Sequence, residues 1–147
     1  MRLKLHIEPV PASAWGLSLA NRLPSKEWNE LRQKVYRDAN YKCEICGASK
    51  RTLHCHEVWT TDDRKKIRHL FKLECCCDLC HDVHHFGRTK VTKSKDKKYL
   101  EECIKHWCKV NHKTMGDFLL YEKEIYALNR KRADRQYIVK VGRKILV

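Results

Sequence analysis

The chain contains no long run of apolar residues. Its first twenty residues, MRLKLHIEPVPASAWGLSLA, are interrupted early by charged side chains and proline, so they lack the apolar core of a secretory signal peptide. No later segment is apolar over the length needed to cross a bilayer. We therefore expect a protein that stays in the cytoplasm and has no membrane partner.

The chain also lacks an even number of cysteines and a large fraction of apolar residues. Its nine cysteines are an odd number, which argues against a complete disulfide framework. The hydrophobic share of 42% includes those cysteines, and 34% of the residues are charged, so a large apolar core is not expected. Metal ligation is the better explanation for the cysteines, and it would help a single domain of residues 1–147 to fold.

Acidic residues are scarce relative to basic ones. The chain has 32 Lys and Arg against 18 Asp and Glu, a net charge of +14. This excess predicts a polyanionic partner, with nucleic acid first, although a merely soluble basic surface has the same composition. Residues 86–147 hold 17 Lys or Arg against 7 Asp or Glu, so phosphate contacts are expected there. The candidate nucleic-acid-binding residues are Lys72, Arg88, Lys90, Lys93, Lys95, Lys97 and Lys98.

The amino-terminal part of the chain carries one strand pattern and one helix pattern. Residues 2–10 alternate polar and apolar side chains, which predicts a short strand. The segment PSKEWNELRQKVYRDANYK has apolar residues at helical spacing, and Ser25 is a plausible helix cap. Residues 43–87 then form a centre rich in metal ligands.

The rest of the chain is predicted as a basic loop followed by a tail of helix and strand. The segment GRTKVTKSKDKK, residues 87–98, reads as the loop, although such a run is often only solvated and flexible. The tail, residues 99–147, is expected to be helical from Tyr99 to Arg135 with a break near NHKTMGD. Its final segment, QYIVKVGRKILV, is a strand candidate that could pair with the amino-terminal strand.

Two CxxC pairs give the strongest local signal in the sequence. Cys43 and Cys46 form the first pair, and Cys77 and Cys80 form the second. Each pair can turn two sulfurs inward on one tight loop, and two such loops supply the tetrahedral thiolate shell of a structural Zn²⁺. Either neighbour, Cys75 or Cys76, could replace Cys77 in the shell. Three further cysteines, Cys55, Cys103 and Cys108, read as small buried side chains.

The segment between the CxxC pairs predicts a β-hairpin followed by a helix. LHCHEVW and IRHLFKLECC read as the two strands, TTDDRKK as the turn, and DLCHDVHHFG as a helix that ends at Gly87. His81 and His85 stand four residues apart on that helix, so both rings lie on one face and can bind one ion. His56 on the first strand could supply a third ligand, whereas His84 falls off the face.

In this order, CxxC, LHCHEVW and CxxCHxxxH resemble the HNH endonucleases with a tetracysteine zinc site, in particular small phage or prophage members. The match covers about residues 20–90. It implies an α+β fold with a small ββα-metal (His-Me finger) core at about residues 25–90, held by a tetracysteine zinc, with flanking helices and terminal strands. It also implies a single nuclease domain of a bacterial or phage-infected cell, acting on duplex DNA, with a homodimer or a phage protein as a possible further partner.

The resemblance leaves the catalytic base open between two registers. In the first, His56 is the strand ligand beside His81 and His85, and Glu57 activates water. In the second, Cys55 is the ligand and His56 the base. The first is preferred because a carboxylate can accept a proton from water, whereas a thiol is a poor ligand for an ion such as Mg²⁺.

The Asn of the HNH motif has no counterpart in this chain. Lys72 stands at its place, and the chain has no Asn between Ala48 and Val110. If the site is active, the resemblance implies DNA phosphodiester hydrolysis, by nicking, at one ion chosen from Mg²⁺, Mn²⁺, Ni²⁺ and Zn²⁺. The alternatives are a degenerate finger that binds nucleic acid without cutting and a module that docks on a protein. The aromatic candidates for such docking, which could equally form a core, are Trp107, Phe118, Tyr121 and Tyr126.

Overall fold

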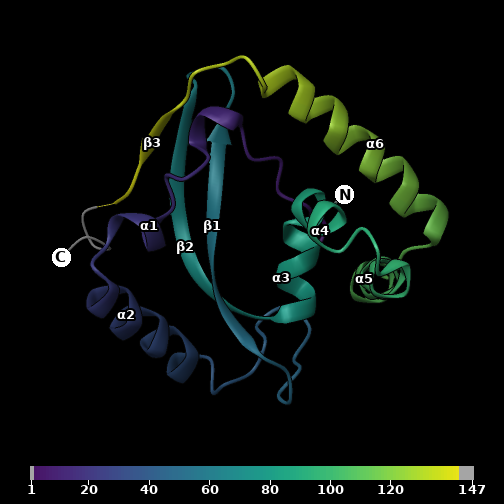
Figure 1. Cartoon of the computed structure of the whole chain (residues 1–147), viewed down its shortest axis with the longest axis horizontal. Coiled ribbons are helices and arrows are strands. Elements are labelled where there is room, and N and C mark those ends of the chain that lie inside the picture. Colours follow the sequence, from purple (N-terminus) through teal and green to yellow (C-terminus); the bar gives the residue numbers. More distant parts are fainter. Residues whose placement is uncertain (1, 143–147) are drawn as a thin grey trace.

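The computed structural model describes residues 2–142 and has an α+β architecture around a long antiparallel hairpin (Figure 1). Strand β1 (Leu53–Asp62) pairs with β2 (Ile67–Cys77), and the short β3 (Ile138–Lys140) joins β2 in parallel. The sheet order is β1-β2-β3, so β1 is an edge strand. The predicted α+β class and the predicted hairpin are confirmed.

The hairpin turn falls where the sequence predicted it. The carboxylate of Asp62 accepts hydrogen bonds from the backbone N–H groups of Arg64 and Lys65, at 3.0 and 2.9 Å. This side-chain bond to the next backbone donors is a common way for Asp to hold a tight turn. The pairing of β1 with β2 shifts register between Val58 and Trp59, as at a β-bulge. Such a shift bends the hairpin near its middle.

Helices flank the hairpin on both sides. Within residues 2–142 they are η1 (Ala12–Ala14), α1 (Leu19–Arg22), α2 (Ser25–Asp38), α3 (Asp78–His84), α4 (Phe86–Thr92), α5 (Lys97–Asn111) and α6 (Met115–Arg132). The first α-helices, α1 and α2, lie on one side of the hairpin, and α3 to α6 lie on the other (Figure 1). None of these helices is long and apolar enough to cross a membrane.

The predicted helical tail and its break are confirmed. Helix α5 ends with His112 in the left-handed region, at φ 53°. Helix α6 then begins after Thr114, whose hydroxyl accepts from the Asp117 backbone N–H at 3.1 Å while the Asp117 carboxylate accepts from the Thr114 backbone N–H at 2.8 Å. This reciprocal capping satisfies the first free N–H groups of α6, so the chain stops one helix and starts the next within a few residues.

The predicted strand at residues 2–10 is wrong. The segment is extended but joins no strand, because side chains of distant helices bind its backbone instead. Asn111 Oδ1 accepts from the Leu5 N–H at 3.0 Å, and the Tyr121 hydroxyl accepts from the Ile7 N–H at 2.9 Å. The side chains of Leu5 and Ile7 are buried in the core, so the segment is fixed between helices.

The predicted basic loop at residues 87–98 is also largely wrong. Helix α4 occupies its first part, and Gly87 lies inside α4 rather than at the end of the preceding helix. Phe86 and Thr89 are buried, and the Thr89 hydroxyl donates to the Asp82 carbonyl oxygen at 2.8 Å. These tertiary contacts hold a helix that the run of lysines and threonines does not favour by itself.

Two smaller predictions need correction. Ser25 is the first residue of α2 rather than its cap, and Pro24 precedes it without a capping side chain. The carboxyl-terminal strand pairs with β2 rather than with the amino-terminal segment, and the Ile138 N–H donates to the Lys66 carbonyl oxygen at 2.9 Å. Residues 143–147 of that predicted strand lie outside the described residues.

The tail aromatics build the core. Trp107 and Phe118 are each 1% exposed, and their rings meet edge to face with centroids 5.2 Å apart. Phe86 from α4 reaches Phe118 at 5.5 Å, and Tyr121 stacks on Trp107 at 5.2 Å. These side chains therefore fasten α4, α5 and α6 together, as the core alternative predicted.

Arg132 at the end of α6 joins segments that are far apart in the sequence. Its guanidinium donates to both carboxylate oxygens of Asp63 in the hairpin turn, at 2.7 Å each, and to the Pro9 carbonyl oxygen at 2.9 Å. The Tyr137 hydroxyl donates to the same Asp63 carboxylate at 2.6 Å. Arg132 is buried, whereas the Asp63 side chain is 36% exposed. Solvent at Asp63 therefore partly screens the attraction between the two charges.

We expect Arg132→Met to lower the free energy of unfolding by about 2 kcal/mol, because it removes the guanidinium donor from the Pro9 carbonyl and from the Asp63 carboxylate, which keeps the Tyr137 hydroxyl. Urea unfolding followed by circular dichroism measures the change. Arg130→Met, on an exposed position of the same helix, is the matched control and should change stability by less than about 0.5 kcal/mol. Equal effects of the two substitutions would contradict this role for Arg132.

Candidate metal centres and the cleft between them

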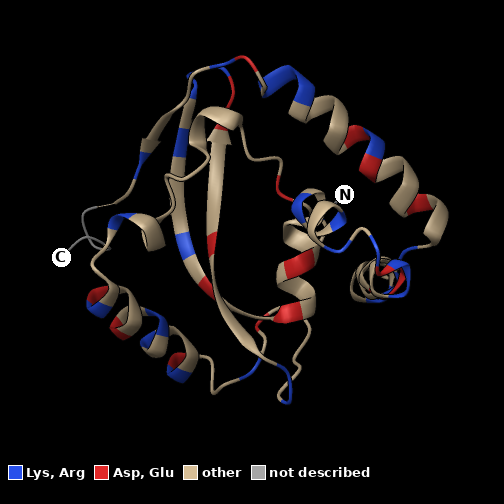
Figure 2. Cartoon of the chain, viewed as in Figure 1, with Lys and Arg blue, Asp and Glu red and all other residues tan. Residues whose placement is uncertain are grey.

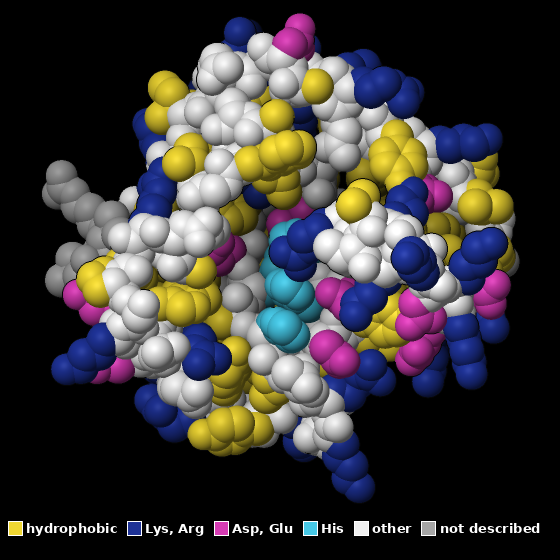
Figure 3. Space-filling view, in the orientation of Figure 1, with side chains coloured by type: hydrophobic (Ala, Val, Ile, Leu, Met, Phe, Trp, Pro, Cys, Tyr) yellow, Lys and Arg dark blue, Asp and Glu magenta, His cyan; other side chains and the backbone are white. Residues whose placement is uncertain are grey.

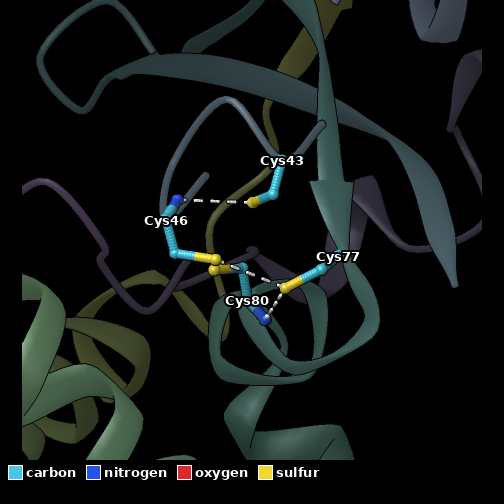
Figure 4. A group of neighbouring side chains, drawn as sticks. All are labelled: Cys43, Cys46, Cys77 and Cys80. Carbon is cyan, nitrogen blue, oxygen red and sulfur yellow. Dashed lines mark hydrogen bonds between the residues drawn. The ribbon is translucent and has the colours of Figure 1, made fainter. Parts of the chain in front are cut away.

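The four predicted zinc cysteines converge at one point. Cys43 and Cys46 come from the loop between α2 and β1, Cys77 ends β2, and Cys80 lies in α3. Their sulfur atoms all lie within 4.8 Å of one another (Figure 4). The cluster could therefore hold a metal, as a structural zinc site requires.

Each CxxC pair has the same contact between a backbone N–H and the first sulfur. The Cys46 N–H points at Cys43 Sγ at 3.4 Å, and the Cys80 N–H points at Cys77 Sγ at 3.5 Å (Figure 4). Gly47 adopts φ +81°, a backbone conformation that favours glycine, and its N–H donates to the Cys43 carbonyl oxygen at 2.8 Å. Backbone N–H groups aimed at sulfur stabilise thiolates, which are the form that binds zinc.

The four sulfurs are close enough for their ionisations to affect one another. Hydrogen bonds from Cys77 and Cys80 lower the pKa of the Cys43 thiol, whereas the bond with Cys43 raises the pKa of Cys77 to about 12 and that of Cys80 as well. Neighbouring thiolates repel one another, so ionisation of one sulfur disfavours ionisation of the others. The His106 Nε2 lies 3.1 Å from Cys80 Sγ and can donate to it once that sulfur is ionised.

The remaining cysteines lie outside this cluster. Cys75 and Cys76 are buried beside it but do not join the four sulfurs. Cys103 is buried in the core, and Cys55 and Cys108 are half-buried. Burial raises the pKa of Cys55 to about 12, so it stays a neutral thiol at physiological pH.

A second set of possible metal ligands lies where β1 faces α3. One ring nitrogen each of His56, His81 and His85 lies within 4.8 Å of the other two. The ring centroids are 4.8 Å apart for His81 and His85 and 5.3 Å apart for His56 and His85. The structure brings together the three residues that the first register named, and Cys55 is not among them.

Two imidazoles of this triad, those of His81 and His85, are held in the neutral form. Burial, with the neighbouring imidazoles, lowers the pKa of His81 to about 2 and that of His85 to about 4. A neutral imidazole has a free lone pair on one nitrogen, which is what a metal ligand needs. His54 stacks on His81 with centroids 4.4 Å apart and limits the orientations of that ring.

Sequence reasoning missed Glu8. Its Oε1 lies 3.1 Å from the Nε2 of His56, and its side chain is 6% exposed. Burial opposes the charge, but the hydrogen bond with His56 and the neighbouring imidazoles outweigh it and lower the pKa of Glu8 to about 2. A signal existed in LHIEP, because residues two apart in an extended segment face the same side, which pairs Glu8 with His6.

Glu57, the predicted base, lies on the edge strand beside the triad. Its carboxylate accepts a hydrogen bond from the Leu19 N–H at the start of α1. Burial raises the pKa of Glu57, against the lowering effect of that backbone donor. A raised pKa makes the carboxylate a stronger base than an exposed glutamate.

The triad opens into a cleft of about 810 Å³. His56, His81 and His85 line it together with Glu57 and Arg88, and apolar side chains such as that of Trp28 complete the walls. Figure 3 shows histidine side chains gathered in a depression at the centre of one face, with Lys and Arg beside them. The metal ligands, the candidate base and a guanidinium therefore share one solvent-accessible space.

The other predicted nucleic-acid-binding residues are more dispersed. Lys90 is held by Glu122 at 2.6 Å and lies over the Tyr126 ring at 4.3 Å, and Lys72 pairs with Glu74 at 2.9 Å. Figure 2 shows basic residues spread over the strands and most of the helices, with acidic residues among them. The exposed lysines of the predicted set are Lys72, Lys93, Lys95, Lys97 and Lys98.

Comparison of the chain with protein-family models, with curated proteins and with solved structures found no match.

Proposed function

We propose that this protein is a metal-dependent endonuclease of the HNH type that nicks duplex DNA. The observation that carries the proposal is the His56, His81 and His85 triad in an open cleft, with the neighbouring Glu57 carboxylate. Three imidazole ligands with room for further ligands are typical of an ion that acts on a substrate rather than one that only holds the fold. The net charge of +14 favours a polyanionic substrate.

The chain order supports a ββα-metal core. The antiparallel hairpin of β1 and β2 runs directly into α3, and the triad takes one ligand from the first strand and the others from the helix and its end. In this proposal the four-cysteine cluster holds a structural zinc that fixes the start of α3 against the loop before β1. The zinc thereby sets the distance between His56 and the helix ligands.

A divalent ion at the triad would polarise the scissile phosphate and stabilise the charge that develops on its oxygens. In this proposal Arg88, which lines the cleft, contacts a phosphate, and Glu57 accepts a proton from the attacking water. Glu8 receives the Nε2–H of His56, which fixes the ring and its tautomer.

The two carboxylates near the triad differ in basicity. The pKa of Glu8 is lowered to about 2, whereas burial raises the pKa of Glu57. Since a carboxylate with a higher pKa accepts a proton more readily near neutral pH, Glu57 is the better base and Glu8 the better partner for His56.

Supercoiled plasmid offers a direct test. Protein stripped of loosely bound metal is incubated with the plasmid and then given Mg²⁺, Mn²⁺, Ni²⁺ or Zn²⁺ in turn. We expect conversion to open circles with at least one ion and none with chelator. Salt-sensitive binding of the plasmid without cleavage under every ion would contradict the nuclease and favour a finger that binds nucleic acid without cutting it.

A further inference from the structure

We propose that His6, Glu8 and His84 form a second divalent-metal site beside the triad. One ligand atom from each of these residues lies within 4.8 Å of the other two. Two of the residues come from the extended amino-terminal segment and the third from α3. This site lies outside the residues that the proposed nuclease chemistry requires as ligands.

His84 carries the first observation, because one of its nitrogens is buried without a partner. Its Nδ1 lies 2.7 Å from the His6 carbonyl oxygen, and since a carbonyl only accepts, Nδ1 must carry the proton. The Nε2 lone pair is then free, and this atom is buried with no hydrogen-bond partner within residues 2–142. An imidazole whose Nδ1–H is held by a backbone carbonyl while Nε2 stays free is a common arrangement of metal-ligating histidines.

Glu8 and His6 complete the site from the other side. The Glu8 backbone N–H donates to the His84 carbonyl oxygen at 2.9 Å, so the segment is fixed against α3 at this point. The Glu8 side chain is 6% exposed, whereas the His6 side chain is 43% exposed. Glu8 and His84 are therefore buried ligands, and His6 is the ligand that faces solvent. An ion can enter the site from the side of His6.

The donor chemistry indicates the class of ion. Two imidazole nitrogens and one carboxylate oxygen suit Zn²⁺, Ni²⁺, Mn²⁺ or Fe²⁺, and three protein ligands leave positions for water. The His84 ring stacks on the His56 ring with centroids 4.2 Å apart, and Glu8 contacts both groups of ligands. The second site is thus adjacent to the triad, and Glu8 connects the two through its contact with His56.

Native mass spectrometry of zinc-loaded protein counts the ions on each chain. We expect three zinc ions on the wild type: one at the cysteines, one at the triad and one at His6, Glu8 and His84. His6→Ala should bind two, because it removes one ligand but keeps the backbone carbonyl that holds His84. His69→Ala, at an exposed position on β2, is the matched control and should bind three.

The outcomes separate this site from the nuclease. His81→Ala should also bind two ions, and the His6→Ala, His81→Ala double variant should bind one. A His6→Ala variant that binds as many ions as the wild type would overturn the second site whatever the plasmid assay gives. Three ions on a wild type that does not cut DNA would support this site and contradict the proposed function.

Discussion

Replacing His81 with Ala is expected to lower metal-dependent nicking of supercoiled plasmid by about 10³-fold or more. The substitution removes one of the three imidazoles that converge on the proposed ion. A catalytic ion contributes several kcal/mol to stabilising the transition state, and each 1.4 kcal/mol corresponds to about a tenfold change in rate. Weaker binding of the ion adds to the loss at limiting metal.

The control for this prediction is again His69→Ala, which removes an imidazole from an exposed position away from the cleft. It should nick plasmid at the wild-type rate. Circular dichroism spectra and zinc content at the cysteines should be the same for both variants, because His81 is not part of the four-cysteine cluster. Unchanged nicking by a folded His81→Ala protein would contradict the assignment of the triad as the catalytic centre.

Removing the metal from the cysteine cluster is expected to unfold the protein. Binding of structural zinc contributes about 10–16 kcal/mol in zinc-finger peptides, which equals or exceeds the net stability of about 5–15 kcal/mol of a typical domain. The cluster joins the loop before β1 to the end of β2 and the start of α3, so its loss frees the hairpin from the helix. Cys80→Ala should likewise lose the bound zinc and the cooperative thermal transition.

Cys108→Ala tests whether this effect belongs to the cluster. Cys108 is half-buried and lies outside the four sulfurs, so its substitution should retain one zinc at the cysteines and a cooperative thermal transition. Thermal unfolding followed by circular dichroism, with and without a strong chelator, measures both effects. A Cys80→Ala protein that melts like the Cys108→Ala protein would show that the fold does not depend on the metal.

Local spacing made several features predictable from the sequence. Two cysteines separated by two residues meet on one turn whatever surrounds them, and histidines four apart share a helix face. The hairpin followed from strand patterns around a polar turn, and the long tail helices followed from their apolar spacing. These features depend mainly on contacts between residues that are close in the chain, so the local sequence is enough to predict them.

Long-range contacts decided what the sequence pattern missed. Residues 2–10 alternate like a strand, yet Asn111 and Tyr121, more than 100 residues away, bind their backbone and keep them out of the sheet. Helix α4 depends on the burial of Phe86 and Thr89 rather than on local propensity.

The sequence by itself determined the local pairs of possible metal ligands, the two CxxC pairs and His81 with His85, because close spacing in the chain constrains their geometry. How these pairs meet one another and His56 depends on the tertiary structure. Only the tertiary structure brought Glu8 to His56 and left His84 with a buried, unpartnered nitrogen. Those placements arise where the amino-terminal segment packs against α3, about 75 residues later in the chain. No local pattern specifies a contact of that range, since it depends on how the whole core closes.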